Sequence, residues 1–150
     1  TRGATRIRLG LQDKLRMGNI DARRDWGHAE DYVNGMFLML QQSEPDDYVL
    51  ATGEQRSARD FLELVFAKLD YEIVWQGSGV DEKGIDRKSG KVLVEIDPVF
   101  FRPTEVNYLC GDSTKARTKL GWKPRHTFHS LVEDMLAHDL ALAEREKNNN

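Results

Sequence analysis

Two adjacent arginines, Arg23 and Arg24, are followed by Asp25 and Trp26 just before a predicted helix. Paired guanidinium groups beside a helix start can bind a phosphate, because their planar forks match phosphate oxygens and the helix dipole favours an anion. The alternative is a solvated turn in which Asp25 neutralises one arginine, and exposed pairs of that kind contribute little to stability. On the residues alone, the solvated turn is the more ordinary interpretation.

A second charged motif runs from Phe100 to Glu105 and includes Arg102 and Pro103. The proline ring fixes the backbone between a cation and a carboxylate and so restricts where both side chains can point. Arg102 could then bind a phosphate while Glu105 accepts hydrogen bonds from ribose hydroxyls. A local Arg–Glu ion pair at the end of a strand explains the same residues equally well.

The glycine-rich segment 77–84 follows a predicted strand, as phosphate-binding loops do. Its spacing matches neither G-x-G-x-x-G nor G-x-x-x-x-G-K-[ST], and no apolar helix follows it. We therefore interpret it as a flexible surface loop.

Histidine and cysteine give no metal-binding pattern. His126 and His129 are three residues apart, His28 and His138 stand alone, and Cys110 has no second thiol. None of these spacings fits a zinc site, so the sequence predicts no metal. The sequence also lacks a dinucleotide-binding fingerprint, a nucleophile elbow and a Tyr followed four residues later by Lys.

The elements that must position these motifs alternate between helices and strands, which indicates an α/β fold. Apolar residues at helical spacing predict helices, one of which has an apolar face made by Ala29, Val33, Met36, Phe37 and Leu40. Ser57 and Asp60 form an imperfect capping box. The predicted helices span 4–17, 29–42, 57–69, 112–120 and 127–147, the predicted strands 48–52, 71–76 and 91–97, and a mobile loop 77–91.

Composition limits the class of protein. The 150 residues are 39% hydrophobic and 31% charged, with a formal net charge of −3 and both signs interleaved. That balance favours neither nucleic acid nor a membrane as a partner, and no apolar run is long enough for a spanning helix. A single cysteine, Cys110, suits the reducing cytoplasm. The chain lacks an initiator Met and opens at the first predicted helix, so we expect a cut at Thr1.

Taken in order, the motifs resemble those of GDP-mannose 4,6-dehydratases, a branch of the extended short-chain dehydrogenase/reductase superfamily. Arg-Asp-Trp and Leu-Gly-Trp-x-Pro alone would indicate only the superfamily. The combination of Gly-Asn-x-Asp-x-x-Arg-Asp-Trp-Gly with Arg-Pro-x-Glu-Val narrows the resemblance to the GDP-mannose branch, and it covers nearly the whole chain. The matching stretches are 18–33, 39–42, 46–53, 101–106, 111–116 and 120–124.

The resemblance implies that residues 1–150 are the C-terminal portion of an extended short-chain dehydrogenase/reductase (NAD(P)-binding, Rossmann-like) fold, mainly its small substrate-binding domain. It assigns Arg24 and Arg102 to the diphosphate of GDP-mannose and Glu105 to the ribose. NADP would be bound by an N-terminal half that this chain lacks. The intact enzyme, a homo-oligomer, would oxidise C4 of the mannose, lose water across C5–C6 and return the hydride to C6, which is the first step toward GDP-fucose. In relatives the catalytic residues lie upstream of this region, so the resemblance implies that this chain holds no catalytic residue and is inactive alone.

One residue departs from the family pattern. Relatives begin this region Thr-Arg-Lys, with the lysine contributing to substrate binding, whereas Gly3 stands at that place here. Arg2 or Arg6 could substitute for the missing cation. Two alternatives remain open at this point: an extended short-chain epimerase or dehydratase acting on another nucleotide sugar, and a non-enzymatic nucleotide-sugar-binding module.

Overall fold

The computed structural model describes residues 1–102, 106 and 108–149, which form two compact units. Unit 1 comprises Thr1–Ala22, Ser57–Glu105 and Val132–Asn150, and unit 2 comprises Arg23–Arg56 and Val106–Leu131. The elements are α1 (Arg2–Leu9), β1 (Leu15–Met17), β2 (Arg23–Asp25), α2 (Ala29–Leu40), β3 (Gln55–Ser57), α3 (Ala58–Ala67), β4 (Ile73–Gln76), η1 (Gly79–Asp81), β5 (Lys83–Asp86), β6 (Val92–Ile96), η2 (Pro98–Phe100), α4 (Thr114–Leu120) and α5 (Phe128–Asn148).

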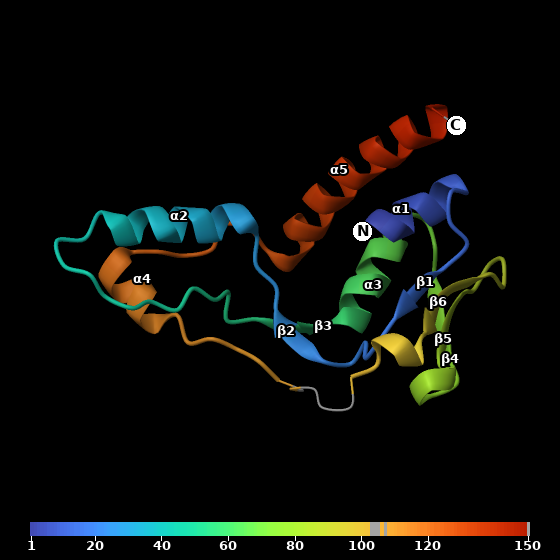
Figure 1. The fold of residues 1–150 in the computed structure, drawn as a ribbon, viewed down its shortest axis with the longest axis horizontal. Helices are drawn as coiled ribbons and strands as arrows, with labels where there is room; N and C mark the ends of the chain where they lie inside the picture. Colours follow the sequence, from blue (N-terminus) through green and yellow to red (C-terminus); the bar gives the residue numbers. More distant parts are fainter. Residues whose placement is uncertain (103–105, 107, 150) are drawn as a thin grey trace. The chain divides into compact units, whose positions relative to one another are not determined.

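Unit 1 contains a four-stranded mixed sheet in the order β1-β6-β5-β4. β1 pairs in parallel with β6, whereas β5 is antiparallel to both of its neighbours. Figure 1 shows α1 and α3 beside this sheet. The buried residues of α1, α3, β6 and the unit 1 part of α5 form the core: Ala4, Ile7, Phe61, Leu62, Val65, Phe66, Leu93, Val94, Ile96, Val132, Leu136 and Ala143.

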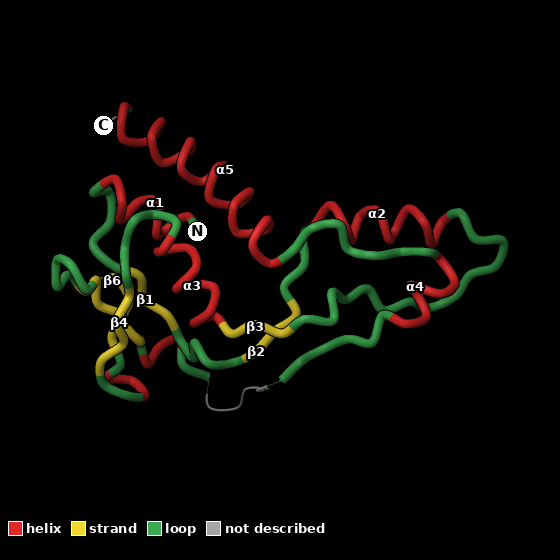
Figure 2. Tube along the Cα trace, turned by 180° about the vertical axis from the view of Figure 1, so that it is seen from behind, coloured by secondary structure: helices red, strands yellow, loops and turns green. Residues whose placement is uncertain are grey.

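Unit 2 contains α2, α4 and the two-stranded ribbon β2-β3, which are marked by secondary structure in Figure 2. Its core is a cluster of Ala116, Leu120 and Trp122 on and after α4, against which side chains of α2 and of segment 48–50 pack. Trp122 is 1% exposed. Gly121, with φ 64°, ends α4 in the left-handed conformation and turns the chain so that Trp122 enters this cluster.

Most of the predicted elements are present. α2, α4 and α5 lie where helical spacing placed them, and β4 and β6 lie inside the predicted strands. The capping box of α3 is complete: Ser57 Oγ accepts the Asp60 amide at 3.0 Å, and the Asp60 carboxylate accepts the Ser57 amide at 2.8 Å. In the part of the chain that the structure describes, no helix is long and apolar enough to cross a membrane.

The predicted helix 4–17 was wrong over its second half. α1 ends at Leu9 because Gly10 adopts φ 78° and its amide returns to the carbonyl of Ile7. Leu15, which continues the four-residue apolar spacing, lies instead on β1 opposite Val94. The four-residue apolar spacing therefore continues past the end of the helix and into a strand.

Two further predictions were wrong. Segment 48–52 is not a strand, and the short strand β3 that follows it was not predicted. Segment 77–91 is not one loop, because it contains η1 and the interior strand β5. β5 has few apolar residues. Its Gly84 is needed for close packing, since a Cβ there would lie 2.9 Å from the ring of Trp75.

Candidate functional site

Two motif-bearing stretches of the chain lie side by side in unit 1. The Asp97 amide donates to the carbonyl of Met17 at 2.8 Å. At Gly18 the approach is so close that a Cβ would lie 2.2 Å from the carbonyl oxygen of Phe100. This contact explains the glycine that opens the Gly-Asn-x-Asp motif. Arg102 follows Phe100 by two residues and is exposed.

The polar residues of that turn hold its conformation. Asn19 Oδ1 accepts the Asp21 amide at 2.9 Å, and Asp21 pairs with Arg59 at 2.8 Å. Arg59 also forms a bidentate pair with Glu82 at 2.8 and 2.9 Å and lies 4.5 Å from the ring centre of Trp75. The hydrogen bonds to Glu82 and then Asp21 outweigh burial and raise the pKa of Arg59. Asn19 and Asp21 therefore have a structural role here.

The continuations of the same two stretches also lie side by side in unit 2. Arg23 on β2 forms a parallel bridge with Tyr108. Arg24 Nη1 donates to the carbonyl of Val106 at 2.6 Å and to that of Arg23 at 2.8 Å. These bonds orient the Arg24 guanidinium toward the segment that directly follows the Arg102–Glu105 motif in the sequence.

Asp25 organises the backbone beside Arg24. Its carboxylate accepts the amides of Thr52 at 2.9 Å and Gly53 at 2.8 Å. It also bonds the side chain of Tyr32, whose pKa is raised by burial first and then by the charge and hydrogen bond of Asp25. The alternative interpretation of the motif gave Asp25 only the role of neutralising an arginine. In the structure Asp25 also holds the backbone of segment 52–53 and the side chain of Tyr32.

A hollow of about 310 Å³ adjoins these residues within unit 2. Arg24, Asp25 and Tyr32 line it together with Leu50, Cys110 and Gly111. Its volume is at the lower end of the range for small-molecule pockets. It offers one guanidinium, a phenol and an apolar wall, a combination that can bind an anion attached to a less polar group.

The remaining motifs of unit 2 are structural. Trp26 Nε1 donates to the carbonyl of Arg56 at 2.8 Å, and Trp122 Nε1 donates to that of Asp31 at 2.8 Å. A Cβ at Gly111 would lie 2.8 Å from Val49 Cγ1. The Arg-Asp-Trp, Gly-Asp-Ser and Leu-Gly-Trp motifs therefore contain residues that are needed for packing. Within them, Arg24 is the candidate for binding a ligand.

Of the predicted site residues, Arg24 lies in unit 2 and Arg102 in unit 1, whereas Glu105 lies outside the described residues. At the departure from the family pattern, a side chain at Gly3 would have to displace Leu15, because a Cβ would lie 2.2 Å from Leu15 Cδ2. Arg2 and Arg6, the possible substitutes for the missing lysine, both pair with Glu146 on α5.

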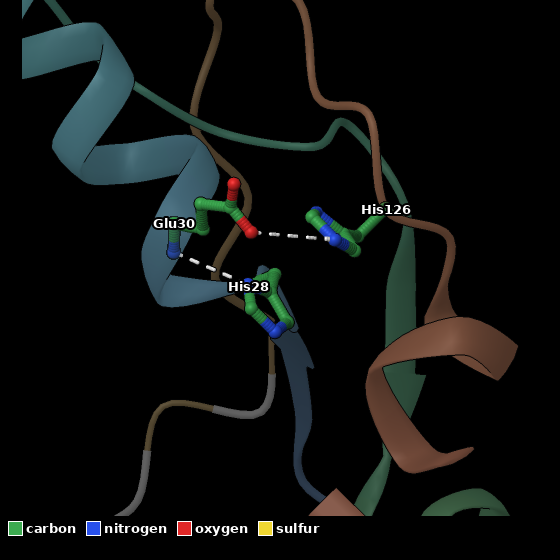
Figure 3. A group of neighbouring side chains, drawn as sticks. All are labelled: His28, Glu30 and His126. Atoms are coloured by element: carbon green, nitrogen blue, oxygen red, sulfur yellow. Dashed lines mark hydrogen bonds and ion pairs between the residues drawn. The ribbon is translucent and has the colours of Figure 1, made fainter. Parts of the chain in front are cut away.

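Sequence spacing did not indicate a cluster at the start of α2. His28 and Glu30 lie there, and the ring of His126 stacks on that of His28 with centres 4.0 Å apart (Figure 3). His126 Nε2 is 3.8 Å from the Glu30 carboxylate. The two histidines are far apart in the sequence, so only the fold of unit 2 brings them together.

Solved structures share the fold of this chain. It matches RMD from Pseudomonas aeruginosa complexed with NADPH with a TM-score of 0.73 at 20% identity, over 94% of this chain and 41% of that one. A dTDP-glucose 4,6-dehydratase from Bacillus anthracis matches with a TM-score of 0.65 at 15% identity, over 90% of this chain and 36% of that one. This is part of the extended short-chain dehydrogenase/reductase fold.

Sequence similarity then identifies the family. The profile described as GDP-mannose 4,6 dehydratase matches residues 1–135, and the chain belongs to this family. Over 95% of its length the chain is 49% identical both to GDP-mannose 4,6 dehydratase of Drosophila melanogaster and to that of Homo sapiens. It spans only 36% and 38% of the length of those two proteins.

Proposed function

We propose that this chain is the C-terminal, substrate-binding portion of a GDP-mannose 4,6-dehydratase and that Arg24 and Arg102 bind the diphosphate of GDP-mannose. The observation that carries the proposal is the match of the family profile to residues 1–135, and within unit 2 Arg24 lines the hollow beside Asp25 and Tyr32. Arg102 is assigned by the family motif and is exposed in unit 1.

The charges and geometry suit this role. A nucleotide-sugar diphosphate carries two negative charges, and guanidinium groups bind phosphate oxygens with short, charge-assisted hydrogen bonds. Two carbonyl oxygens already orient Arg24, which lowers the conformational entropy lost on binding. Glu105, three residues after Arg102, is assigned to the ribose hydroxyls by the family motif.

The reaction of the intact enzyme converts GDP-mannose to GDP-4-keto-6-deoxymannose and water, with NADP as the hydride carrier. The residues of this chain do not fit a dinucleotide: no glycine fingerprint is present, and no Tyr is followed four residues later by Lys. We assign the NADP site and the catalytic residues to the part of the enzyme that lies outside this chain. The contribution of the chain is to hold the sugar nucleotide in place for that chemistry.

An exposed apolar face supports a larger assembly. The face of α2 predicted from helical spacing points to solvent, with Val33 62%, Met36 57%, Phe37 58% and Leu40 81% exposed. Contiguous apolar surface of this kind marks a protein interface. We propose that the rest of the enzyme covers it, in a cytoplasmic homo-oligomer.

Calorimetric titration of the chain with GDP-mannose, UDP-glucose and dTDP-glucose tests the assignment. We expect GDP-mannose to bind most tightly, and no turnover when NADP⁺ is added. Tighter binding of UDP-glucose or dTDP-glucose would favour an epimerase or dehydratase for another nucleotide sugar. Binding of none of the three would contradict the proposal, and so would product formation by the chain alone.

A further inference from the structure

We propose that His28, Glu30 and His126 form a binding site for a divalent transition metal such as Zn²⁺ in unit 2. Each residue offers one ligand atom, and the three atoms lie within 4.8 Å of one another. Figure 3 shows the Glu30 carboxylate directed toward the His126 ring, with the two imidazoles adjacent. Two imidazoles and one carboxylate are a donor set that suits zinc, copper or nickel, and three protein ligands leave an open position for water.

The Asp31 carboxylate already fixes the ring of His126, and the ring of His28, stacked on it at an interplanar angle of 19°, would turn to share an ion with it. Its Nδ1 lies 3.1 Å from Oδ2 of Asp31, which is 3% exposed, and its backbone amide donates to the same oxygen at 3.0 Å. A neutral imidazole that donates from Nδ1 has its lone pair on Nε2. That Nε2 is the atom 3.8 Å from Glu30. A carboxylate that fixes the histidine ring in this way is the usual outer support of a metal ligand.

Metal binding by His28 would replace a hydrogen bond that this residue makes at the start of α2. It caps α2, with Nδ1 accepting the Glu30 amide at 3.2 Å. Coordination through Nδ1 uses the lone pair that accepts this bond, and coordination through Nε2 leaves the proton on Nδ1. In either case the cap hydrogen bond is exchanged for a metal bond. Binding should therefore expose the Glu30 amide, which gives a signature specific to this site.

A bound ion would link the first turn of α2 to the segment that precedes α5. Both belong to unit 2, and the bond from Trp122 Nε1 to the carbonyl of Asp31 already connects the same parts of the chain. A metal that binds only the folded state stabilises it in proportion to the logarithm of its free concentration. We therefore expect Zn²⁺ to raise the melting temperature of the chain.

Zinc titration of the chain with a competing chelator tests the site directly. We expect one Zn²⁺ per chain, with His28→Ala and His126→Ala each weakening binding by roughly tenfold or more. His129→Ala and His138→Ala are matched controls, because both histidines are exposed and lie outside the cluster, and their affinities should equal that of the wild type. Glu30→Gln tests a ligand whose side chain is exposed, so it should weaken binding without unfolding the chain.

The Glu30 amide supplies the second readout. Its NMR signal should shift, and its hydrogen exchange should accelerate, on addition of Zn²⁺ to the wild type but not to His28→Ala. The proposal is overturned if no saturable binding occurs at millimolar Zn²⁺. It is also overturned if the His28, Glu30 and His126 variants all bind as tightly as the wild type, since the ion would then be held elsewhere.

Discussion

Replacing Asp31 by Asn should destabilise the chain, because this carboxylate accepts several bonds in a buried position. It is 3% exposed and accepts the backbone amide of His126 at 3.0 Å and its Nδ1 at 3.1 Å. Burial opposes its ionisation, but hydrogen bonds from the backbone amides of His126 and Arg125 outweigh burial and lower the pKa of Asp31. Asn has the same shape but no charge, and its amide group would face hydrogen-bond donors.

The magnitude follows from the lost bonds. A hydrogen bond to a charged group contributes about 1.5–3 kcal/mol, and a neutral one about 1 kcal/mol. Of the three bonds, from the His126 amide, the His126 ring and the Arg125 amide, the Asn oxygen can keep two as neutral bonds, so we expect the free energy of unfolding to fall by about 3 kcal/mol at pH 7. That is a large part of the roughly 5–15 kcal/mol typical of a domain. Asp13→Asn, at an exposed aspartate, should change it by less than about 0.5 kcal/mol.

The pH dependence separates the charge from packing. The pKa of Asp31 in the folded chain lies below its ordinary value of 3.8, so its stabilisation is fully present above about pH 4. The stabilisation is lost as the pH falls through the folded-state pKa of Asp31. Below that pH the side chain of residue 31 is uncharged in both the wild type and Asp31→Asn. Urea unfolding at pH 7 and near pH 3 measures this. A difference under about 0.5 kcal/mol at pH 7, or one that persists undiminished near pH 3, would refute the reasoning.

Two further substitutions test the packing of unit 2. Gly111→Ala should lower the free energy of unfolding by about 1–3 kcal/mol, because its Cβ would lie 2.9 Å from the Cβ of Ala51. Cys110→Ala, at an exposed neighbour, is the control, and equal urea midpoints for the two variants would contradict the packing argument. Trp122→Phe should lower the free energy of unfolding by about 2–4 kcal/mol, because it loses the bond to the Asp31 carbonyl and leaves a cavity in the core. Calorimetric melting measures this loss, and an unchanged melting temperature would disprove the role of the indole.

Local signals predicted much of the fold. The capping box of α3 is a chemical feature of adjacent residues, so the sequence shows it directly. The helix prediction for 4–17 failed because apolar residues four apart suit a helix, while contact of Leu15 with Val94 was decided by the parallel pairing of β1 with β6. Spacing along the chain contains no information about that pairing.

The two other failures also have tertiary causes. Residues 48–52 have the composition of a strand, but at their end the backbone amides of Thr52 and Gly53 donate to the Asp25 carboxylate instead of to a neighbouring strand. The strand β5 is not recognisable in the sequence, because it contains a glycine and charged residues. Its burial depends on the ring of Trp75 beside Gly84 and on the turn in which Ser89 Oγ donates to Asp86.

The candidate site was predictable only in part. Arg24 and Arg102 were named from residue type and family resemblance, and the structure adds the contacts that run between the stretches carrying them. It also adds Tyr32 beside Asp25 and the pairing of His28 with His126, for which the sequence holds no signal. Residues far apart in a sequence reveal a shared site only after folding.

The most direct test of the account is the affinity of the chain for GDP-mannose after removal of each arginine. Arg24→Ala and Arg102→Ala should each weaken binding by roughly 10- to 100-fold, the loss of a charge-assisted contact to phosphate of about 1.5–3 kcal/mol. Arg23→Ala, at the exposed neighbour on β2, should bind as the wild type does. If Arg24→Ala and Arg102→Ala both keep the wild-type affinity, the two arginines do not bind the diphosphate, and the central claim is wrong.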